Sequence, residues 1–411
     1  MPQKSATGEG LVVVGGCLAG LRAVQAARRS GFPGRIVLVG REPVLPYDRP
    51  PLSKSFLTEP GAEPTFYAGE AELAGLNVEM RLGSEATGLD LGSRTVLAGG
   101  APVTYDKLIV ATGADARPLP VTPRLAGVET LRTITDATRV RDALRHARNV
   151  VVVGAGFIGS ELSSAARQLG ARVTIVEAAA TPLVRALGET VGDAVSRLHE
   201  RHGVRLLRGT SLEKIIGDTS ITAVTLSNGE TLETDLLIVG IGAAPATGWL
   251  RDSGLELHPA DGGLVCNAEL RTSDEHVYAA GDVVHWPNAL MGTTMRLENW
   301  TNAAEQGARA TLNALFPERA EAYETVPYCW SDWYGHRIQF VGTAAAESVT
   351  FVDGSPDDDR FTALYRTGDR VVAAASLNER RLIMKLRRLI AARGSWDDAL
   401  ALVRAKAGST R

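Results

Sequence analysis

The same local pattern occurs twice in this chain, and it constrains the fold more than any other feature. Each copy is a short β-branched run, a glycine-rich turn, a helical stretch and a second apolar run. The first copy covers residues 11–39 with the turn GGCLAG, and the second covers residues 150–176 with the turn GAGFIG. This order is the βαβ unit of a dinucleotide-binding fold. The copies are ~140 residues apart, too far for the halves of one mononucleotide pair, so they predict two separate dinucleotide-binding domains.

The glycines of such a turn have different tasks. The first permits a tight bend, the second lets backbone N–H groups approach a pyrophosphate, and the third allows close helix–strand packing. The anion then lies at a helix N-terminus, where the helix dipole and unpaired donors favour it. The second turn has Gly154, Gly156 and Gly159 in these places, whereas the first has Cys17 in the middle place. Because Cys is small, we expect the first turn to bind a nucleotide as well.

The acidic residue at the end of each unit indicates the kind of dinucleotide. Glu177 stands ~20 residues after its glycine turn, where a carboxylate accepts hydrogen bonds from the adenosine ribose 2′-OH. A 2′-phosphate would meet like charge there, and no Arg follows Glu177 within four residues. The second unit is therefore expected to prefer NADH over NADPH. The alternative interpretation is that Glu177 is simply a solvated residue at a strand end and does not bind the ribose. Glu42 is the candidate ribose ligand of the first unit.

The remaining sequence completes these domains and adds a third. Strand-like runs at Lys107–Ala111, Asp235–Gly240 and His276–Ala280 each lead into glycine. Beyond about Thr325 the pattern changes to aromatic-rich alternating strands followed by helices, which is typical of an α+β domain. The predicted fold class is therefore α/β, with two Rossmann-like domains of the glutathione reductase type and a C-terminal α+β domain.

Composition excludes several classes of protein. A net charge of −3 in 411 residues does not favour nucleic-acid binding. No apolar run approaches the ~18–20 residues of a membrane helix. No apolar signal core precedes Leu11, so we expect a cytoplasmic protein. The three cysteines (Cys17, Cys266 and Cys329) are far apart and form no metal-type cluster, so no metal site is expected.

Seven motifs carry a resemblance to a known family. They are LPYDRPPLSK at 45–54, ATG at 111–113, LRT at 131–133, GAGFIGSE at 154–161, AGDV at 280–283, ENWTNAAEQG at 298–307 and VPYCWSDWYG at 326–335. In this order they resemble the oxygenase- and P450-coupled ferredoxin reductases, the putidaredoxin reductase family. The chain is also similar, more distantly, to apoptosis-inducing factor.

The resemblance implies FAD in a discontinuous domain at residues 1–117 and 246–324, NAD at 118–245, and a C-terminal domain at 325–411 that closes over the flavin. The motifs then assign FAD contacts to Gly15, Leu18, Ala19, Gly20, Glu42, Arg49, Lys54, Ala86, Ala111, Thr112, Gly113, Arg132, Gly281, Asp282, Glu298 and Trp300. They assign NAD contacts to Gly154, Gly156, Phe157, Ile158, Gly159, Glu161, Glu177, Arg185 and Gly242.

Two of these residues are assigned to the catalytic machinery. The resemblance implies that Lys54 and Glu161 form an ion pair beside flavin N5, where the pair positions the ring and compensates its charge. A buried unpaired Lys is costly, so the pairing is physically reasonable. The alternative is a purely structural salt bridge.

The destination of the electrons follows by elimination. Disulfide reductases keep a cysteine pair after the first strand–helix unit, whereas this chain has YDRPPLSK at residues 47–54. Thiol relay is therefore disfavoured. The remaining hypothesis is that NADH reduces FAD, with Gly242 leaving room for the nicotinamide, and that the electrons pass singly to a [2Fe–2S] ferredoxin serving a P450 or ring-hydroxylating oxygenase.

A basic segment near the C-terminus is the candidate docking surface for an acidic ferredoxin. Leu382, Leu386, Leu389 and Ile390 share one helical face, and cations dominate elsewhere, namely Arg380, Arg381, Lys385, Arg387 and Arg388. The alternative is a solvated helix face. Trp330 and Trp333 are large aromatics expected near the flavin, with core packing at least as good an interpretation.

Two other functions stay open at this point. One is an NADH oxidase or diaphorase that donates electrons to oxygen or quinones. The other is a redox-responsive NAD-binding scaffold of the apoptosis-inducing factor type, although the sequence lacks the long insertions expected there.

Overall fold

The computed structural model describes residues 10–119 and 125–408. The first nine residues, where the sequence shows no apolar signal core, lie outside this range. The contacts within the chain divide it into two compact units. The first unit comprises Met1–Asp48, Thr65–Asp115 and Ala244–Thr325, and the second comprises Arg49–Pro64, Ala116–Ala243 and Val326–Arg411.

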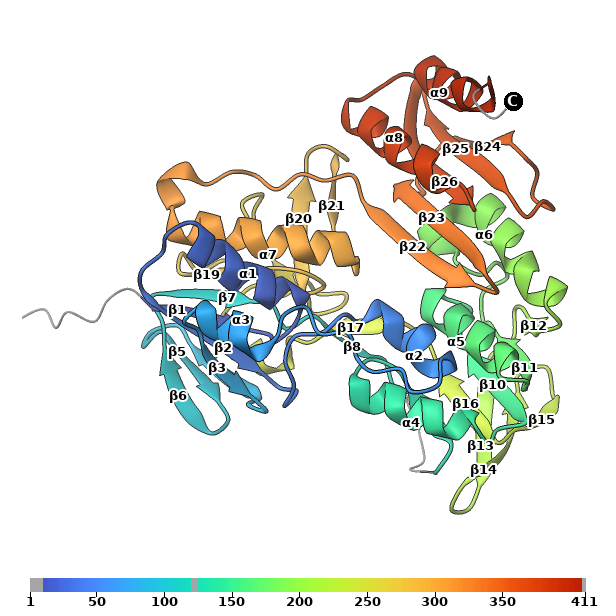
Figure 1. The fold of residues 1–411 in the computed structure, drawn as a ribbon, viewed down its shortest axis with the longest axis horizontal. Coiled ribbons are helices and arrows are strands. Elements are labelled where there is room, and N and C mark those ends of the chain that lie inside the picture. The colour runs from blue at the N-terminus through green and yellow to red at the C-terminus, as the bar shows by residue number, and fades with distance from the viewer. Residues whose placement is uncertain (1–9, 120–124, 409–411) are drawn as a thin grey trace, which may run out of the picture. The chain divides into compact units, whose positions relative to one another are not determined.

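The first unit is built on a five-stranded parallel sheet (Figure 1). Its order is β19 (Val277–Ala279), β7 (Lys107–Val110), β1 (Gly10–Val14), β2 (Arg35–Gly40) and β3 (Glu79–Leu82). The central strands are buried on both faces, as expected of a parallel sheet with covered faces. Helices α1 (Leu18–Arg29) and α7 (Trp300–Leu315) pack against each other, which brings the first glycine turn and the ENWTNAAEQG motif into the same unit.

Smaller elements complete the first unit. They are α3 (Glu70–Gly75), β4 (Ala86–Asp90), β5 (Thr95–Ala98), β6 (Ala101–Thr104), η2 (Gly248–Leu250), β18 (Leu264–Val265), β20 (Val284–Asn288), β21 (Thr293–Met295) and η3 (Pro317–Arg319). The chain passes between the two units after Asp48, Pro64 and Thr325, and within β8 (Ala114–Ala116) and β17 (Ala243–Pro245).

The second unit repeats the same architecture. Its parallel sheet has the order β12 (Arg205–Leu207), β11 (Arg172–Val176), β10 (Asn149–Val153), β16 (Leu236–Val239) and β9 (Val128–Thr130). Helix α5 (Phe157–Gln168) follows the second glycine turn, and α4 (Ile134–Leu144) begins with a capping box formed by Thr133 and Asp136. An antiparallel sheet of β13 (Leu212–Gly217), β14 (Ile221–Leu226) and β15 (Thr231–Glu233) packs on this core.

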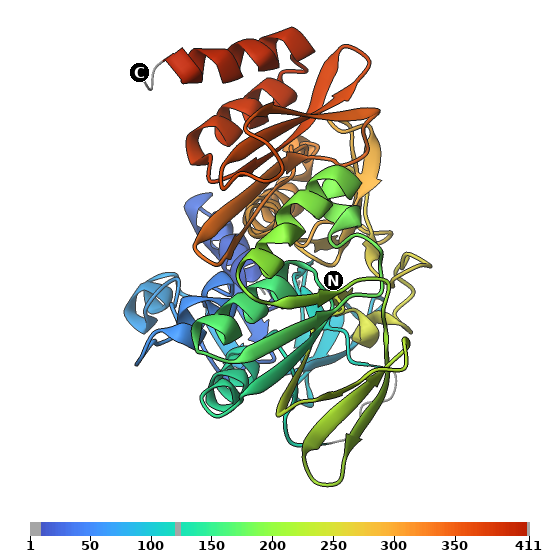
Figure 2. The same ribbon diagram turned by 90° about the vertical axis from the view of Figure 1, so that its right-hand side faces the viewer.

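The C-terminal part of the second unit is an antiparallel sheet with two helices. The strand order is β22 (Tyr328–Trp333), β23 (His336–Gly342), β26 (Arg370–Leu377), β25 (Phe361–Thr367) and β24 (Ser348–Asp353), and the helices are α8 (Arg380–Ala391) and α9 (Trp396–Gly408). Helix α6 (Val184–Arg201) buries Leu187, Val191 and Val195 against this sheet. Figure 2 shows the helix in light green beside the orange sheet. Helix α6 of the nucleotide-binding part and the C-terminal sheet therefore share a hydrophobic core.

The segment Arg49–Pro64 belongs to the second unit, although the division drawn from the sequence assigned it to the FAD-binding domain. Its short helices η1 (Pro50–Ser53) and α2 (Ser55–Thr58) pack on α4 and α5. The Arg141 guanidinium lies 4.3 Å from the centre of the Phe56 ring and donates to Ala62 O at 3.0 Å. These long-range contacts have no local sequence signal.

The predicted α/β fold with a C-terminal α+β domain is confirmed. Among the residues described here, no helix combines the length and apolarity that a bilayer crossing requires.

Candidate functional site

The first glycine turn connects β1 to α1 in the first unit. Gly15 has φ +134°, and a Cβ there would lie 2.0 Å from Ala111 O. A Cβ on Gly20 would lie 1.9 Å from Gly15 O. Both places therefore require glycine. Cys17 is accommodated because its Sγ donates to Ala111 O at 3.0 Å, which gives the side chain a backbone partner directly after β7.

The second glycine turn connects β10 to α5 in the second unit. A Cβ on Gly154 would lie 2.4 Å from Gly240 O, and one on Gly159 would lie 2.1 Å from Gly154 O. A Cβ on Gly156, the N-cap of α5, would meet nothing within 4 Å. Gly156 therefore borders open space at a helix N-terminus, which fits a site for a pyrophosphate.

Glu177 lies directly against this second turn. Its Oε2 accepts a hydrogen bond from Ala155 N at 2.7 Å, and its Oε1 accepts one from Ala179 N at 2.8 Å. The carboxylate is thus fixed at the end of β11 beside the phosphate cradle, where the ribose of a dinucleotide would lie. Arg185 is exposed and has no polar partner among the described residues, and Gly242 is exposed at φ +97°.

In the first unit the corresponding acid is Glu42, shortly after the end of β2. Tyr47 is 3% exposed and donates its hydroxyl to Glu42 Oε2 at 2.6 Å. Ala111–Gly113 directly follow β7, and Ala86 is the first residue of β4. The unit therefore contains the glycine turn and the acid that the sequence predicts for a second dinucleotide.

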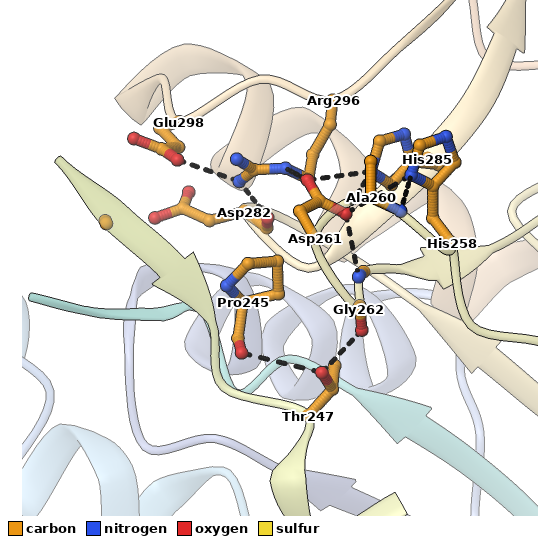
Figure 3. Close-up of polar contacts among 12 residues, drawn as sticks. Pro245, Thr247, His258, Ala260, Asp261, Gly262, Asp282, His285, Arg296 and Glu298 are labelled. Atoms are coloured by element: carbon orange, nitrogen blue, oxygen red, sulfur yellow. Dashed lines mark hydrogen bonds and ion pairs between the residues drawn. The ribbon is translucent and has the colours of Figure 1, made fainter. Parts of the chain in front are cut away.

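The Gly281–Asp282 turn after β19 is held by the buried Gln306 and the partly buried Arg296. Gln306 Oε1 accepts from Gly281 N at 2.8 Å, and Arg296 Nη1 donates to Asp282 O at 3.0 Å. Arg296 also pairs with Glu298 Oε1 at 2.8 Å and donates through Nε to Asp261 Oδ2 at 2.7 Å (Figure 3). Sequence reasoning selected Asp282 and Glu298 but missed the arginine that joins them.

Asp261 is the anchor of that arginine. Burial raises its pKa, but the Gly263 N–H, His285 and Arg296 outweigh burial and lower the pKa to about 2. His285 Nε2 lies 2.9 Å from Asp261 Oδ1, and the His258 and His285 rings stack with centroids 4.0 Å apart and planes at 7° (Figure 3). Because imidazole binds a metal in its ring plane, one ion cannot lie in both of these nearly parallel planes. This cluster therefore serves as support for Asp261.

Trp300 begins α7 and is fixed by its indole. Its Nε1 donates to Asp48 Oδ1 at 2.9 Å and to Tyr67 OH at 2.8 Å, while Tyr67 OH lies 2.7 Å from Asp48 Oδ1. Burial, with the Asp48 carboxylate, raises the pKa of the Tyr67 hydroxyl, so that hydroxyl stays protonated. The start of α7 is therefore rigidly placed within the first unit.

Lys54 and Glu161 come together in the second unit. Lys54 Nζ lies 2.8 Å from Glu161 Oε1, and the Glu161 side chain is only 3% exposed. Lys54 also donates to Pro50 O at 3.1 Å. Nearby, Arg49 Nη1 donates to Arg132 O at 2.7 Å, so the second unit also contains two of the arginines assigned to FAD.

Sequence reasoning missed the hydroxyls that bind the same carboxylate. Ser53 Oγ donates to Glu161 Oε2, and Ser331 Oγ donates to Glu161 Oε1. Trp333 Nε1 donates to Ser331 Oγ at 2.7 Å, and Trp333 is fully buried. Both serines stand inside recognised motifs, PPLSK and WSDWYG, which was the only signal available for them.

The predicted site residues are thus divided between the units. The first unit holds Gly15, Leu18, Ala19, Gly20, Glu42, Ala86, Ala111, Thr112, Gly113, Gly281, Asp282, Glu298 and Trp300. The second unit holds Arg49, Lys54, Arg132, Gly154, Gly156, Phe157, Ile158, Gly159, Glu161, Glu177, Arg185 and Gly242.

Known proteins share these features. Residues 10–307 match the pyridine nucleotide-disulphide oxidoreductase family, and residues 328–405 match the reductase C-terminal family. The chain is 37% identical to the ferredoxin–NAD(+) reductase component of the anthranilate 1,2-dioxygenase system from Burkholderia cepacia, over 94% of this chain and 95% of the relative. It is 35% identical to the rhodocoxin reductase of Rhodococcus erythropolis, over 93% of this chain and 89% of the relative.

A solved structure has the same fold. Putidaredoxin reductase, crystallised in a covalent complex with putidaredoxin, matches with a TM-score of 0.89 at 29% sequence identity, over 97% of this chain and 99% of that chain. The resemblance inferred from the motifs is thereby confirmed. Membership of this family supports FAD and a nicotinamide dinucleotide as the cofactors of the chain. The chain belongs to the pyridine nucleotide-disulphide oxidoreductase family, in the group that resembles putidaredoxin reductase.

Proposed function

We propose that this chain is an FAD-dependent reductase that passes electrons from NADH to a [2Fe–2S] ferredoxin, which in turn serves a P450 or ring-hydroxylating oxygenase. The observation that carries the proposal is the presence of two glycine turns in one chain, each between a parallel strand and a helix and each with an acid at or shortly after the end of the next strand. The names of the relatives, a dioxygenase-system ferredoxin–NAD(+) reductase and rhodocoxin reductase, support this choice.

FAD would be held by the first unit. The glycine turn presents the N-terminus of α1 to the pyrophosphate, and Glu42 accepts from a ribose hydroxyl. The turn at Asp282 presents a carboxylate for the ribityl hydroxyls, and Arg296 fixes that turn. Bound there, FAD would supply the redox chemistry, taking a hydride from NADH and releasing the two electrons one at a time.

Lys54 would supply the charge next to the flavin. Its ammonium has three protons, and Glu161 and Pro50 O take two of them. No further partner of Lys54 lies among the described residues, so one proton remains to face a cofactor. Glu161 acts through Lys54, because its buried carboxylate holds the ammonium in place.

NADH would be preferred over NADPH because of Glu177. Its carboxylate is fixed by two backbone N–H groups, so it cannot easily turn away from a 2′-phosphate. The Glu177 carboxylate would repel a 2′-phosphate because both are negatively charged, whereas a 2′-hydroxyl would donate a hydrogen bond to the carboxylate.

The cysteines argue against a thiol relay. None of the three, all of which the structure describes, forms a disulfide, and burial raises the pKa of Cys266 well above its usual range and that of Cys329 to about 12. Only a thiolate attacks a disulfide, so neither residue is reactive at neutral pH. Cys17, inside the first glycine turn, donates its thiol hydrogen to Ala111 O. Direct transfer to a one-electron carrier fits this chain better than disulfide chemistry.

The ferredoxin would dock on the exposed face of α8. Arg380, Arg381, Lys385 and Arg388 are exposed there around Met384, which is 37% exposed, while Leu382, Leu386 and Ile390 are buried. Arg387, also assigned to docking from the sequence, has a different environment. It donates to Val326 O at 2.9 Å and lies over the Tyr328 ring at 6.0 Å, so it ties α8 to the start of β22.

One experiment tests the proposal against both alternatives. The purified protein is examined for flavin absorbance, and reoxidation after NADH is followed with and without an acidic [2Fe–2S] ferredoxin and cytochrome c. Fast turnover that requires ferredoxin supports the proposal. Turnover with oxygen or quinone alone indicates an oxidase or diaphorase, and a long-lived NADH complex indicates a scaffold. A protein that cannot be loaded with flavin overturns all three.

A further inference from the structure

The carboxylate of Glu161 receives three donors from two other segments of the second unit. Lys54 and Ser53 belong to the segment that ends in PPLSK, and Ser331 belongs to β22 of the C-terminal sheet. Ser331 is 170 residues from Glu161 in the sequence, and its side chain is fully buried. The C-terminal domain thus contributes one hydroxyl to the ion pair of the nucleotide-binding part.

The direction of this hydrogen bond is fixed by its neighbour. An indole N–H can only donate, so Ser331 Oγ must accept from Trp333 Nε1. The single hydroxyl proton of Ser331 is then directed to Glu161. Trp333 is itself held in place by stacking on His199, with ring centroids 5.2 Å apart. Burial lowers the pKa of His199 to about 3, so this imidazole is neutral and adds no competing charge.

Another serine of the same sheet shows that burial alone does not explain this arrangement. Ser376, in β26, is 1% exposed, and its hydroxyl has no partner among the described residues. A buried serine is therefore tolerated in this sheet without any acceptor. Ser331, by contrast, is both acceptor and donor in a directed chain that ends on Glu161.

We propose that Ser331 is a positioning residue for the redox site, acting through Glu161 on Lys54. With Ser331 on Oε1 and Ser53 on Oε2, the carboxylate is held in one rotamer, and it holds the Lys54 ammonium in one orientation. The reductase C-terminal domain then supplies a hydrogen bond that fixes the Lys54–Glu161 ion pair, in addition to providing α8 as the proposed docking helix. This inference rests on the proposed role of Lys54 beside the flavin.

The test compares two nearly isosteric variants, Ser331→Thr and Ser331→Val. Threonine keeps the hydroxyl and valine lacks it. We expect Ser331→Val to slow flavin reduction by NADH about tenfold and to shift the flavin midpoint potential, because a hydrogen bond to a charged group is lost. The dissociation constant of NADH should stay unchanged. Ser331→Thr should restore both values, and Ser376→Ala should leave them unaltered.

A second readout does not depend on turnover. In the flavin-free protein labelled with ¹⁵N-lysine, the Lys54 ammonium should give a protected NMR signal that disappears in Ser331→Val and persists in Ser331→Thr. If the valine variant does not fold, Ser331→Ala replaces it. Identical potentials, rates and NMR signals in the threonine and valine variants would overturn the inference. If Lys54→Met also leaves reduction and potential unchanged, the proposed role of the ion pair fails instead.

Discussion

Glu177 Oε2 accepts a hydrogen bond from the backbone N–H of Ala155 at 2.7 Å, which fixes the acid of the second βαβ unit against its own glycine turn. The same carboxylate also accepts from Ala179 N at 2.8 Å. A charge held in this way at the end of β11 is part of the cradle. We expect it to select among dinucleotides by what they carry at the ribose 2′ position.

Replacing this acid should change the coenzyme preference. In Glu177→Ala combined with Ala178→Arg, the repulsion of a 2′-phosphate is removed and a cation is added. We expect the ratio of kcat/KM for NADPH to that for NADH to rise by roughly two orders of magnitude. Steady-state kinetics with both coenzymes measure this ratio. The exposed Glu213→Ala is the control, and an unchanged NADH preference in the double variant would show that Glu177 does not read the ribose.

Removing the ammonium of the ion pair should impair flavin reduction. Lys54→Met leaves the buried Glu161 with hydroxyl donors only, and an uncompensated buried charge costs about 3–5 kcal/mol. We therefore expect slower reduction by NADH in stopped-flow traces and a lower free energy of unfolding. Lys214→Met, at an exposed lysine of β13, should change neither quantity. Normal traces in Lys54→Met would leave the pair a purely structural role.

The two kinds of arginine on α8 should respond differently. Reversing exposed charges in Arg381→Glu with Lys385→Glu should raise the KM for ferredoxin several-fold and weaken its salt dependence, because such charges steer association. Reduction of an artificial acceptor such as ferricyanide should stay normal. Arg387→Ala should instead lower the melting temperature, since Arg387 holds Val326 O. Equal ferredoxin kinetics in the charge-reversed and parent proteins would place docking elsewhere.

Arg296 should matter for retention of FAD. Arg296→Met removes the cation that connects the Asp282 turn to Glu298 and Asp261. We expect the dissociation constant of FAD to rise roughly tenfold or more, because several charge-assisted hydrogen bonds are lost. Titration of flavin-free protein with FAD, followed by fluorescence, measures it. Arg319→Met, at an arginine whose side chain is 81% exposed, is the matched control. Equal FAD affinity in Arg296→Met and Arg319→Met would contradict the role of Arg296.

Acid should destabilise the second unit through His199. Burial, with Arg208 and His202 nearby, lowers the pKa of this fully buried imidazole to about 3. Between that value and the unfolded-state pKa of about 6.5, the unfolded chain binds the proton and the folded chain does not, so acid favours unfolding. We expect a loss of about 2 kcal/mol in unfolding free energy from pH 6.5 to pH 5.

Urea unfolding at both pH values measures that loss. His199→Gln should reduce the pH dependence, whereas the exposed His146→Gln should retain it. A pH dependence that is the same in both variants would assign the acid sensitivity to other groups.

The nucleotide cradles were predictable because their signals are local. Gly15 and Gly154 adopt positive φ, and Gly20 and Gly159 lie against the backbone oxygens of Gly15 and Gly154, five residues earlier in the chain. Any side chain at these four places would clash, so the requirement for glycine can be read from spacing alone. The same holds for Glu177, whose place follows from the length of one βαβ unit.

The partners of Glu161 and Asp282 were not predictable in this way. Ser331 reaches Glu161 only because α6 and the C-terminal sheet share a core, and Arg296 reaches Asp282 across a loop and a hairpin. The placement of Arg49–Pro64 likewise depends on Arg141 and Phe56, which no local pattern connects. Contacts between side chains that are brought together only by tertiary packing produce no periodic pattern in the sequence.

The sequence by itself determined two dinucleotide folds, an α+β ending and the absence of a cysteine pair beside the first cradle. Backbone geometry at a turn depends on neighbours in the chain, so composition and spacing suffice for it. Tertiary structure alone decided which donors hold the Glu161 carboxylate, that Arg387 ties α8 to Val326, and that Asp261 fixes Arg296. Those contacts depend on burial, because a charge removed from water is costly unless a donor or an opposite charge pairs with it, and the fold determines which groups lie close enough.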